Sequence, residues 1–177
     1  MLAGRDVEAQ GGLQGEVDRS HARDNRTVPS RARATSLVPG RISEAEELWY
    51  DPYRWPAWVD GFGHIVKLEG EWPDVGARLV WASPPRGRGG VQEIVTAYEP
   101  RTGQTRAIED ERLSGTQIVT FEAADADHVR VTLTLDYELK GRNAFTPLVD
   151  RIFIRRELTD SLRRTLTRFG HERRAEL

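Results

Sequence analysis

Histidine and cysteine, the side chains that most often carry chemistry, are few and scattered in this chain of 177 residues. The chain has no cysteine, which excludes a thiol nucleophile, a disulfide framework and a cysteine-based zinc site. The histidines lie far apart, at His21, His64, His128 and His171, and none belongs to an HExxH motif. We therefore expect no metal site and no cofactor. His64 alone lies on the apolar face of a predicted strand, where it would point inward or lie at a rim.

Two further segments resemble functional motifs but lack the context that those motifs need. Ser114-Gly115 does not follow a strand-to-helix turn, as a hydrolase nucleophile would. Gly87-Arg88-Gly89-Gly90 is neither a P-loop nor a GxGxxG motif, and no predicted helix follows it to bind a phosphate. We interpret this segment as a hairpin loop.

Charge and hydropathy narrow the classes of partner. The net charge is −2, and only Lys67 and Lys140 of the 26 basic residues are lysine. We attribute this arginine bias to a GC-rich genome, and we expect no nucleic-acid partner. No apolar run could span a membrane, and the charged pair Arg5-Asp6 leaves no room for a signal peptide. These features predict a cytoplasmic protein without stable membrane insertion, and nothing indicates its oligomeric state.

The first 30 residues differ in composition from the rest of the chain. They contain no aromatic residue and no helical stripe of apolar residues. Such a segment buries too little apolar surface to offset the entropy cost of ordering it. We predict a disordered leader over residues 1–30 and a single domain over residues 31–177.

Alternating apolar and polar residues separated by turn residues predict a series of strands in the body. The clearest is Val129–Lys140, whose odd-numbered residues from Val129 to Leu139 are apolar or aromatic. In Gly63–Gly70, the same rule places His64, Val66 and Leu68 on one face. The other predicted strands are Arg31–Val38, Ala77–Ser83, Val91–Tyr98, Gln104–Glu109 and Leu113–Ala123.

Helix signals occur at two places. Ser43 and Glu46 have the spacing of a capping box, which predicts a helix that ends at Asp51-Pro52 and is followed by a short broken turn. Near the C-terminus, Thr146 as N-cap and Pro147 at the first position predict a long helix to about Glu172. The apolar stripe of this helix recurs at mostly helical spacing and consists of Leu148, Ile152, Leu158, Leu162, Leu166 and Phe169, widened by Val149 and Phe153. A long amphipathic helix lying along a one-sided antiparallel sheet would bury both apolar faces.

This order of elements resembles the helix-grip fold, an α+β fold, and more closely the polyketide cyclase/dehydrase and lipid-transport family of the START-like (SRPBCC) superfamily. The resemblance covers about Arg31 to Phe169. It rests on Glu47-Leu48-Trp49-Tyr50-Asp51 with Arg54-Trp55-Pro56-Ala57-Trp58-Val59, on Gly76-Ala77-Arg78-Leu79-Val80-Trp81, on Val95-Thr96-Ala97-Tyr98-Glu99-Pro100 and on the helix from Pro147. It implies a curved sheet of about seven strands around the C-terminal helix, with two short helices between the first two strands.

The resemblance also implies a hydrophobic cavity between sheet and helix, which would bind a small hydrophobic or aromatic molecule. From strand and helix faces we expect its lining to include Trp58, Phe62, Leu79, Trp81, Leu133, Leu135, Tyr137, Ile152 and Phe153. The inward candidates for proton transfer or oxyanion binding are Tyr137, His64 and Arg156. Glu93 and Glu109 would join them if their strands present the opposite face.

Three functions remain open on this sequence. A carrier of a polyketide-like or lipid-like molecule needs only the cavity. A polyketide cyclase or aromatase also needs polar groups that converge on the ligand. A non-catalytic interaction domain would fill the same space with a packed core.

Overall fold

The computed structural model describes residues 30–87, 89–140 and 148–177, with side chains of the last range from Ile152 onward. The predicted leader lies outside this part of the chain, except that Ser30 begins the first strand. The elements in chain order are β1 (Ser30–Pro39), α1 (Ile42–Trp49), the 3₁₀ turn η1 (Pro52–Arg54), α2 (Trp55–Trp58), β2 (His64–Glu69), β3 (Arg78–Ala82), β4 (Gly90–Glu99), β5 (Gly103–Glu109), β6 (Leu113–Ala123), β7 (His128–Leu139) and α3 (Leu148–Ala175).

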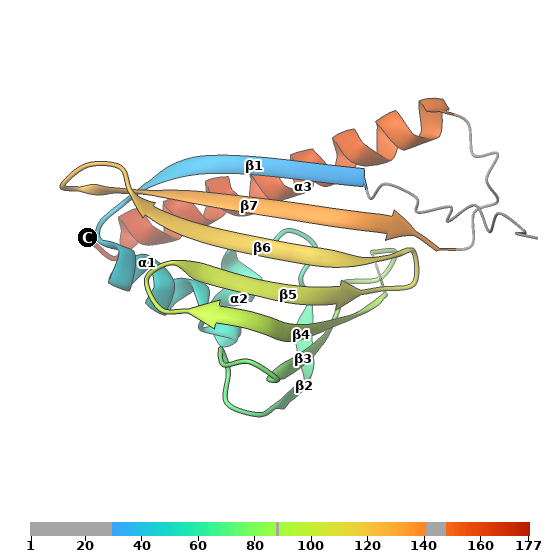
Figure 1. Ribbon diagram of the computed structural model, residues 1–177, viewed down its shortest axis with the longest axis horizontal. Coiled ribbons are helices and arrows are strands. Elements are labelled where there is room, and N and C mark those ends of the chain that lie inside the picture. Colours follow the sequence, from blue (N-terminus) through green and yellow to red (C-terminus); the bar gives the residue numbers. More distant parts are fainter. Residues whose placement is uncertain (1–29, 88, 141–147) are drawn as a thin grey trace, which may run out of the picture.

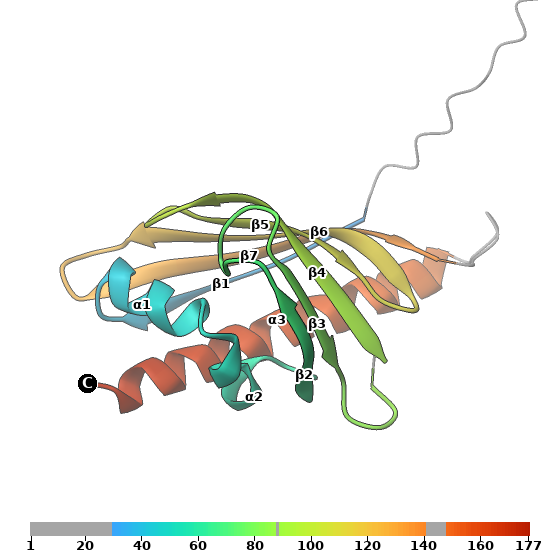
Figure 2. The same cartoon turned by 90° about the horizontal axis from the view of Figure 1, so that it is seen from below.

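The seven strands form one antiparallel sheet in the order β1-β7-β6-β5-β4-β3-β2. The first strand pairs with the last, so the chain returns to its own beginning before α3 starts (Figure 1). The sheet arches over α3, while α1 and α2 cover one end of its concave side (Figure 2). This is the helix-grip fold, and it confirms the architecture expected from the sequence.

The strand β2 departs from the predicted alternation. Its pairing with β3 shifts between Ile65 and Lys67, which leaves Val66 as a bulge. A bulge inserts one unpaired residue and reverses the faces of the residues on one side of it. As a result, Ile65 and Leu68 pack against the core, while Val66 and His64 are exposed. The prediction that His64, Val66 and Leu68 share the inward face is therefore wrong.

The helix α1 begins one residue before the predicted cap. Its N-cap is Arg41, and the backbone N–H of Arg41 donates to Glu44 Oε2 at 2.9 Å. Glu46, which was expected to close a capping box with Ser43, instead accepts a hydrogen bond from the Arg101 backbone at 2.7 Å. That bond ties α1 to the turn between β4 and β5, so a tertiary contact has replaced the local one.

The buried stripe of α3 consists of Leu158, Leu162, Leu166 and Phe169, as the sequence predicts. Ile152 and Phe153 were expected to continue it, but they are 60% and 65% exposed. Ile152 lies six residues before Leu158, which places it on a different side of the helix. The half-buried residue in line with the stripe is Ile154. The predicted cap at Thr146 and Pro147 lies outside the described residues.

Aromatic side chains fill the space between α1, α2 and α3. The ring centroids of Trp49 and Trp58 are 4.7 Å apart, and both rings meet Phe169 of α3 edge-on at 5.1 and 5.0 Å. Trp55 continues the cluster to Phe62, whose ring lies 5.1 Å from that of Trp81. This cluster packs α1 and α2 against α3 and, through Phe62, against β3.

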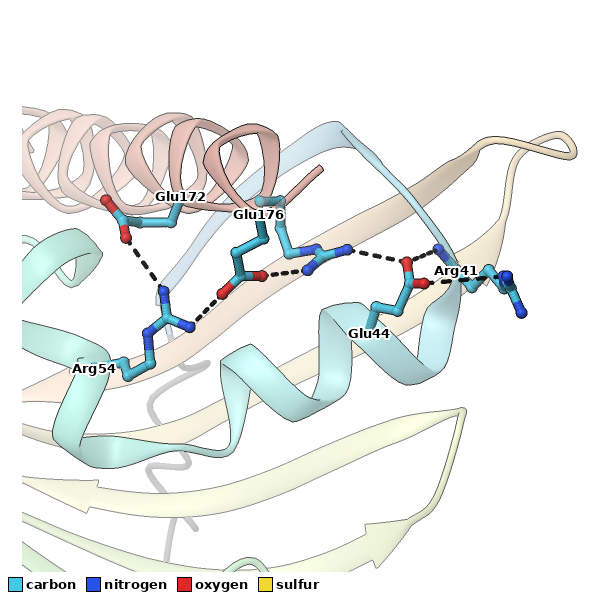
Figure 3. A network of polar contacts seen from close by, with 6 residues as sticks. Arg41, Glu44, Arg54, Glu172 and Glu176 are labelled. Carbon is cyan, nitrogen blue, oxygen red and sulfur yellow. Dashed lines mark hydrogen bonds and ion pairs between the residues drawn. The ribbon is translucent and has the colours of Figure 1, made fainter.

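An ion-pair network fastens the last turn of α3 to α1 and η1 (Figure 3). The buried side chain of Arg173 donates to Glu176 and, at 3.0 Å, to Glu44 Oε2. Arg54 in turn contacts Glu176 and lies 3.5 Å from Glu172. Because the network joins residues more than 100 positions apart, it anchors the C-terminal end of α3 to the N-terminal part of the domain.

Candidate functional site: two adjoining cavities under the sheet

The larger cavity has a volume of about 630 Å³ and lies between α3 and the ends of β5, β6 and β7. We call it the outer cavity. Its size is within the range of ligand pockets in proteins. Its lining combines apolar and charged side chains: Asp60, Gly61, Asp110, Glu111, Arg112, Leu113, Leu139, Lys140, Phe153, Ile154, Glu157, Leu158, Ser161 and Arg164.

A second cavity of about 40 Å³, the inner cavity, lies deeper under the sheet. Asp60 and Ser161 line both cavities, so the two adjoin. The remaining residues of the inner lining are Trp49, Trp55, Trp58, Val59, Trp81, Val91, Glu93, Arg106, Ile108, Gln117, Leu133, Leu162 and Thr165. The inner space is large enough for one small functional group or a few water molecules, but too small for a ring system.

Four neighbouring strands each contribute one polar side chain to the inner cavity. Trp81 Nε1 donates to Glu93 Oε1 at 2.9 Å, and Arg106 Nη1 donates to Glu93 Oε2 at 2.6 Å. Arg106 Nη2 also donates to Gln117 Oε1. Arg106 lies directly opposite Gln117 in the ladder between β5 and β6. The antiparallel register therefore brings Trp81, Glu93, Arg106 and Gln117 together on the concave face.

The Glu93–Arg106 pair is almost completely buried, with side chains 6% and 3% exposed. The Arg106 guanidinium also lies over the rings of Trp55 and Trp72, at 5.2 and 5.9 Å from their centroids. A buried ion pair is tolerated when its charges compensate each other and are hydrogen-bonded. Glu93 and Arg106 thus form an ion pair in the inner lining whose two charges cancel.

Asp60 joins the loop after α2 to the middle of α3. Its carboxylate accepts hydrogen bonds from Ser161 at 2.8 Å and from Arg164 at 2.7 Å, and Arg168 lies 3.3 Å away. Its backbone N–H donates to Thr165 Oγ1 at 3.0 Å. Burial alone would raise the pKa of Asp60, but the hydrogen bonds from Arg164 and Ser161 and the positive charges hold it below its ordinary value. Asp60 is therefore held as an anion where the two cavities adjoin. We call Asp60 and its contacts with Ser161, Arg164 and Thr165 the clamp.

The predicted cavity residues are divided between the cavities and the packed core. Trp58, Trp81 and Leu133 line the inner cavity, and Phe153 lines the outer one despite its exposure. The others, Phe62, Leu79 and Leu135, are buried, and Ile152 is exposed, but none of these four lines either cavity.

Tyr137 is buried on the inward face of β7, as its alternation predicts, but it lines neither cavity. Burial raises the pKa of its hydroxyl, and a hydrogen bond with Ser30 opposes that rise. Arg156, which was also expected to point inward, has a side chain that is 80% exposed. Arg156 lies two residues before Leu158, and hence on the opposite side of α3 from the buried stripe.

Of the two carboxylates whose strand faces were open, Glu93 points inward and Glu109 is exposed and paired with Lys140. Arg106 and Gln117 are not among the site residues predicted from the sequence. The sequence does show that Gln104, Arg106 and Ile108 alternate with Thr105 and Ala107, so the first three share one face of the strand. Polar residues on both faces of a strand do not reveal which face is buried, and only pairing with Glu93 identifies it.

Comparison with known proteins shows the fold. No protein-family model matches the chain, and no curated protein matches it by sequence. A Staphylococcus aureus protein of unknown function, SA2116, is 10% identical with a TM-score of 0.65, over 84% of this chain and 96% of that one. Norcoclaurine synthase from Thalictrum flavum, in complex with dopamine and hydroxybenzaldehyde, is 11% identical with a TM-score of 0.60, over 96% and 95%.

DynU16, a putative protein in the dynemicin biosynthetic locus, is 19% identical with a TM-score of 0.55, over 80% of this chain and 46% of that one. Identities this low establish a shared helix-grip fold and not a shared activity.

Two further observations concern metal sites and membrane spans, and both apply to the described residues. No group of three acidic or histidine side chains could hold a metal ion there. None of the described helices is long and apolar enough to cross a membrane.

Proposed function

We propose that the protein binds a small hydrophobic or aromatic molecule in the outer cavity, with one end of the molecule directed toward the inner cavity. The observation that carries this proposal is the pair of adjoining cavities between α3 and the sheet. A packed interaction domain would place side chains there instead. The proposal agrees with the resemblance to the polyketide cyclase/dehydrase and lipid-transport family, and with the aromatic molecules present in the norcoclaurine synthase complex.

Catalysis as a cyclase or aromatase would need a group that moves a proton at the ligand. In the inner cavity, both carboxylate oxygens of Glu93 already accept hydrogen bonds, from Trp81 and Arg106. In the clamp, Asp60 accepts bonds from Ser161 and Arg164. Because the oxygens of both carboxylates already accept hydrogen bonds from the protein, neither is free to contact a ligand proton, and we propose binding or transport rather than turnover.

The test uses N-phenyl-1-naphthylamine, a neutral probe whose fluorescence rises in an apolar site. We expect the wild-type protein to bind it with a dissociation constant on the order of micromolar. Leu139, at the end of β7, lines the outer cavity. Leu139→Trp should fill part of that space and weaken binding by roughly tenfold or more, a loss of about 1.4 kcal/mol.

The matched control is Leu37→Trp, the same change at a side chain of β1 that is 51% exposed and outside both linings. It should leave the dissociation constant unchanged. If the wild-type protein does not bind the probe, or if the two variants weaken binding equally, the outer cavity is not a ligand site.

A further inference from the structure

Three buried N–H groups around the inner cavity have no hydrogen-bond partner among the described residues: Trp49 Nε1, Trp58 Nε1 and Arg106 Nε. Their residues are 2%, 1% and 3% exposed, and all three line this cavity. Buried polar groups in folded proteins are almost always paired, so three unpaired donors around one cavity call for an explanation. An acceptor that enters the cavity would supply it.

The acceptors of the same cavity are already engaged. The two oxygens of Glu93 accept from Trp81 and Arg106, and Gln117 Oε1 accepts from Arg106. The inner cavity therefore offers free donors and few free acceptors, which favours a ligand group that accepts hydrogen bonds over one that donates them.

Charge and size restrict that group further. Among the described residues, Arg106 is the one basic residue of the inner lining, and Glu93 at 2.6 Å compensates its charge, while Asp60 adds a further carboxylate to that lining. A ligand carboxylate would therefore meet acidic groups with no uncompensated cation in the described lining. The volume of about 40 Å³ admits one functional group, while a ring system fits only the outer cavity of about 630 Å³.

We infer that the inner cavity receives an uncharged oxygen acceptor of the ligand, such as the carbonyl of an aromatic ketone or quinone, which Trp49, Trp58 and Arg106 bind through these N–H groups. This inference rests on the proposed function and adds the chemical class of the ligand. The aromatic body of such a ligand occupies the outer cavity, between α3 and the end of β7.

The experiment compares three naphthalenes of similar shape as competitors of N-phenyl-1-naphthylamine. They are 2-acetylnaphthalene, which carries a carbonyl, 2-isopropylnaphthalene, which has no acceptor, and 2-naphthoate, which is charged. We expect the acetyl compound to bind about tenfold more tightly than the isopropyl compound, because it pairs buried donors that the other leaves unpaired. The carboxylate should bind more weakly than the acetyl compound.

Two variants assign the preference to the indole N–H. Trp58→Phe keeps an aromatic ring but removes the donor, so the acetyl preference should fall to roughly threefold or less, as one hydrogen bond is lost. Tyr53→Phe is the control, because it also removes an aromatic donor, from a side chain that is 74% exposed and lines neither cavity. Its acetyl preference should equal that of the wild type. A ratio measured within one variant cancels a general loss of affinity.

Nuclear magnetic resonance gives a readout that needs no variant. The five tryptophans give five indole N–H signals in the ¹⁵N-labelled protein. The signals of Trp49 and Trp58 should move to lower field with the acetyl compound and not with the isopropyl compound.

In the competition experiment, equal affinities of the acetyl and isopropyl compounds would overturn the inference and leave the proposed function in place. Tightest binding of 2-naphthoate would overturn the uncharged class. If neither N-phenyl-1-naphthylamine nor any naphthalene binds, the proposed function itself fails.

Discussion

At the scale of single residues, Arg106 is the centre of the site. It contacts Glu93 and Gln117 through hydrogen bonds and the rings of Trp55 and Trp72 through its guanidinium face. Arginine suits this position because its planar group donates in several directions and stacks on aromatic rings at the same time. The residue links the sheet to the aromatic cluster. We therefore expect its loss to reduce the free energy of unfolding, whether or not a ligand is bound.

The first prediction concerns this buried pair. Arg106→Met should destabilise the protein by about 3–5 kcal/mol, because it leaves the Glu93 carboxylate buried without a compensating charge. The double variant Glu93→Leu/Arg106→Met removes both charges and should be less destabilised than Arg106→Met alone. Urea unfolding of the two variants and of Glu93→Leu measures the difference. A cost below about 0.5 kcal/mol for Arg106→Met would mean that Glu93 is not held as a buried anion.

At the scale of elements, the packing of α3 against the sheet determines where the outer cavity lies. Its C-terminal half packs through Leu162, Leu166 and Phe169, while Ile152 and Phe153 near its N-terminal end are exposed. The figures show this end of the helix extending past the end of β1 (Figures 1 and 2). The outer cavity lies along the N-terminal half of α3, from Phe153 to Arg164, where the helix faces the ends of β5, β6 and β7.

The second prediction tests this attachment. Leu162 is 5% exposed, and Leu162→Ala should cost about 2–5 kcal/mol, because it leaves a cavity that the rigid sheet cannot fill. The neighbouring change Arg163→Ala is the control, since the Arg163 side chain is 66% exposed and should cost within about 0.5 kcal/mol. Thermal or urea unfolding measures both. Equal costs would contradict the packing of α3 against the sheet.

At the scale of the whole molecule, carboxylates with lowered pKa hold distant parts of the chain together. Asp60 joins the loop after α2 to the middle of α3, and Glu176 joins the end of α3 to Arg54. Burial opposes ionisation of Glu176, but hydrogen bonds from Arg54 and Arg173 lower its pKa below the ordinary value. Both groups favour the folded state when they are ionised.

The third prediction follows from this linkage. A carboxylate whose pKa is lower in the folded state stabilises the protein above its unfolded pKa, and this contribution is lost as the pH falls through the folded pKa. The ordinary pKa of Asp60 is 3.8, so its contribution should be complete near neutral pH and should decrease as the pH falls below that value.

Asp60→Asn should therefore reduce the free energy of unfolding near neutral pH by about 1–2 kcal/mol, with a smaller reduction in strong acid. Urea unfolding across the acid range measures this, with Asp127→Asn at an exposed position as the control. If the destabilisation by Asp60→Asn does not change with pH, the charge of Asp60 does not contribute to the contact between the loop after α2 and α3.

The architecture could be predicted from the sequence, apart from the faces of β2. The strand β7 and the stripe of α3 were predictable because a strand with one wet face and a helix with one buried face impose fixed periods on the residue types. Turn residues such as Pro39-Gly40 and Asp125-Ala126-Asp127 then set the ends of the strands. These are local constraints, and the sequence states them directly.

The composition of the site could not be predicted, because it depends on side-chain contacts between different strands. The bulge at Val66 moved His64 to the surface, and strand pairing brought Glu93, Arg106 and Gln117 together from three strands. Arg106 is charged, and its burial depends on a partner that no local pattern identifies. A charged residue on a strand is predicted to be exposed when its cross-strand neighbour is unknown. The free energy of burying its charge depends on the group that pairs with it.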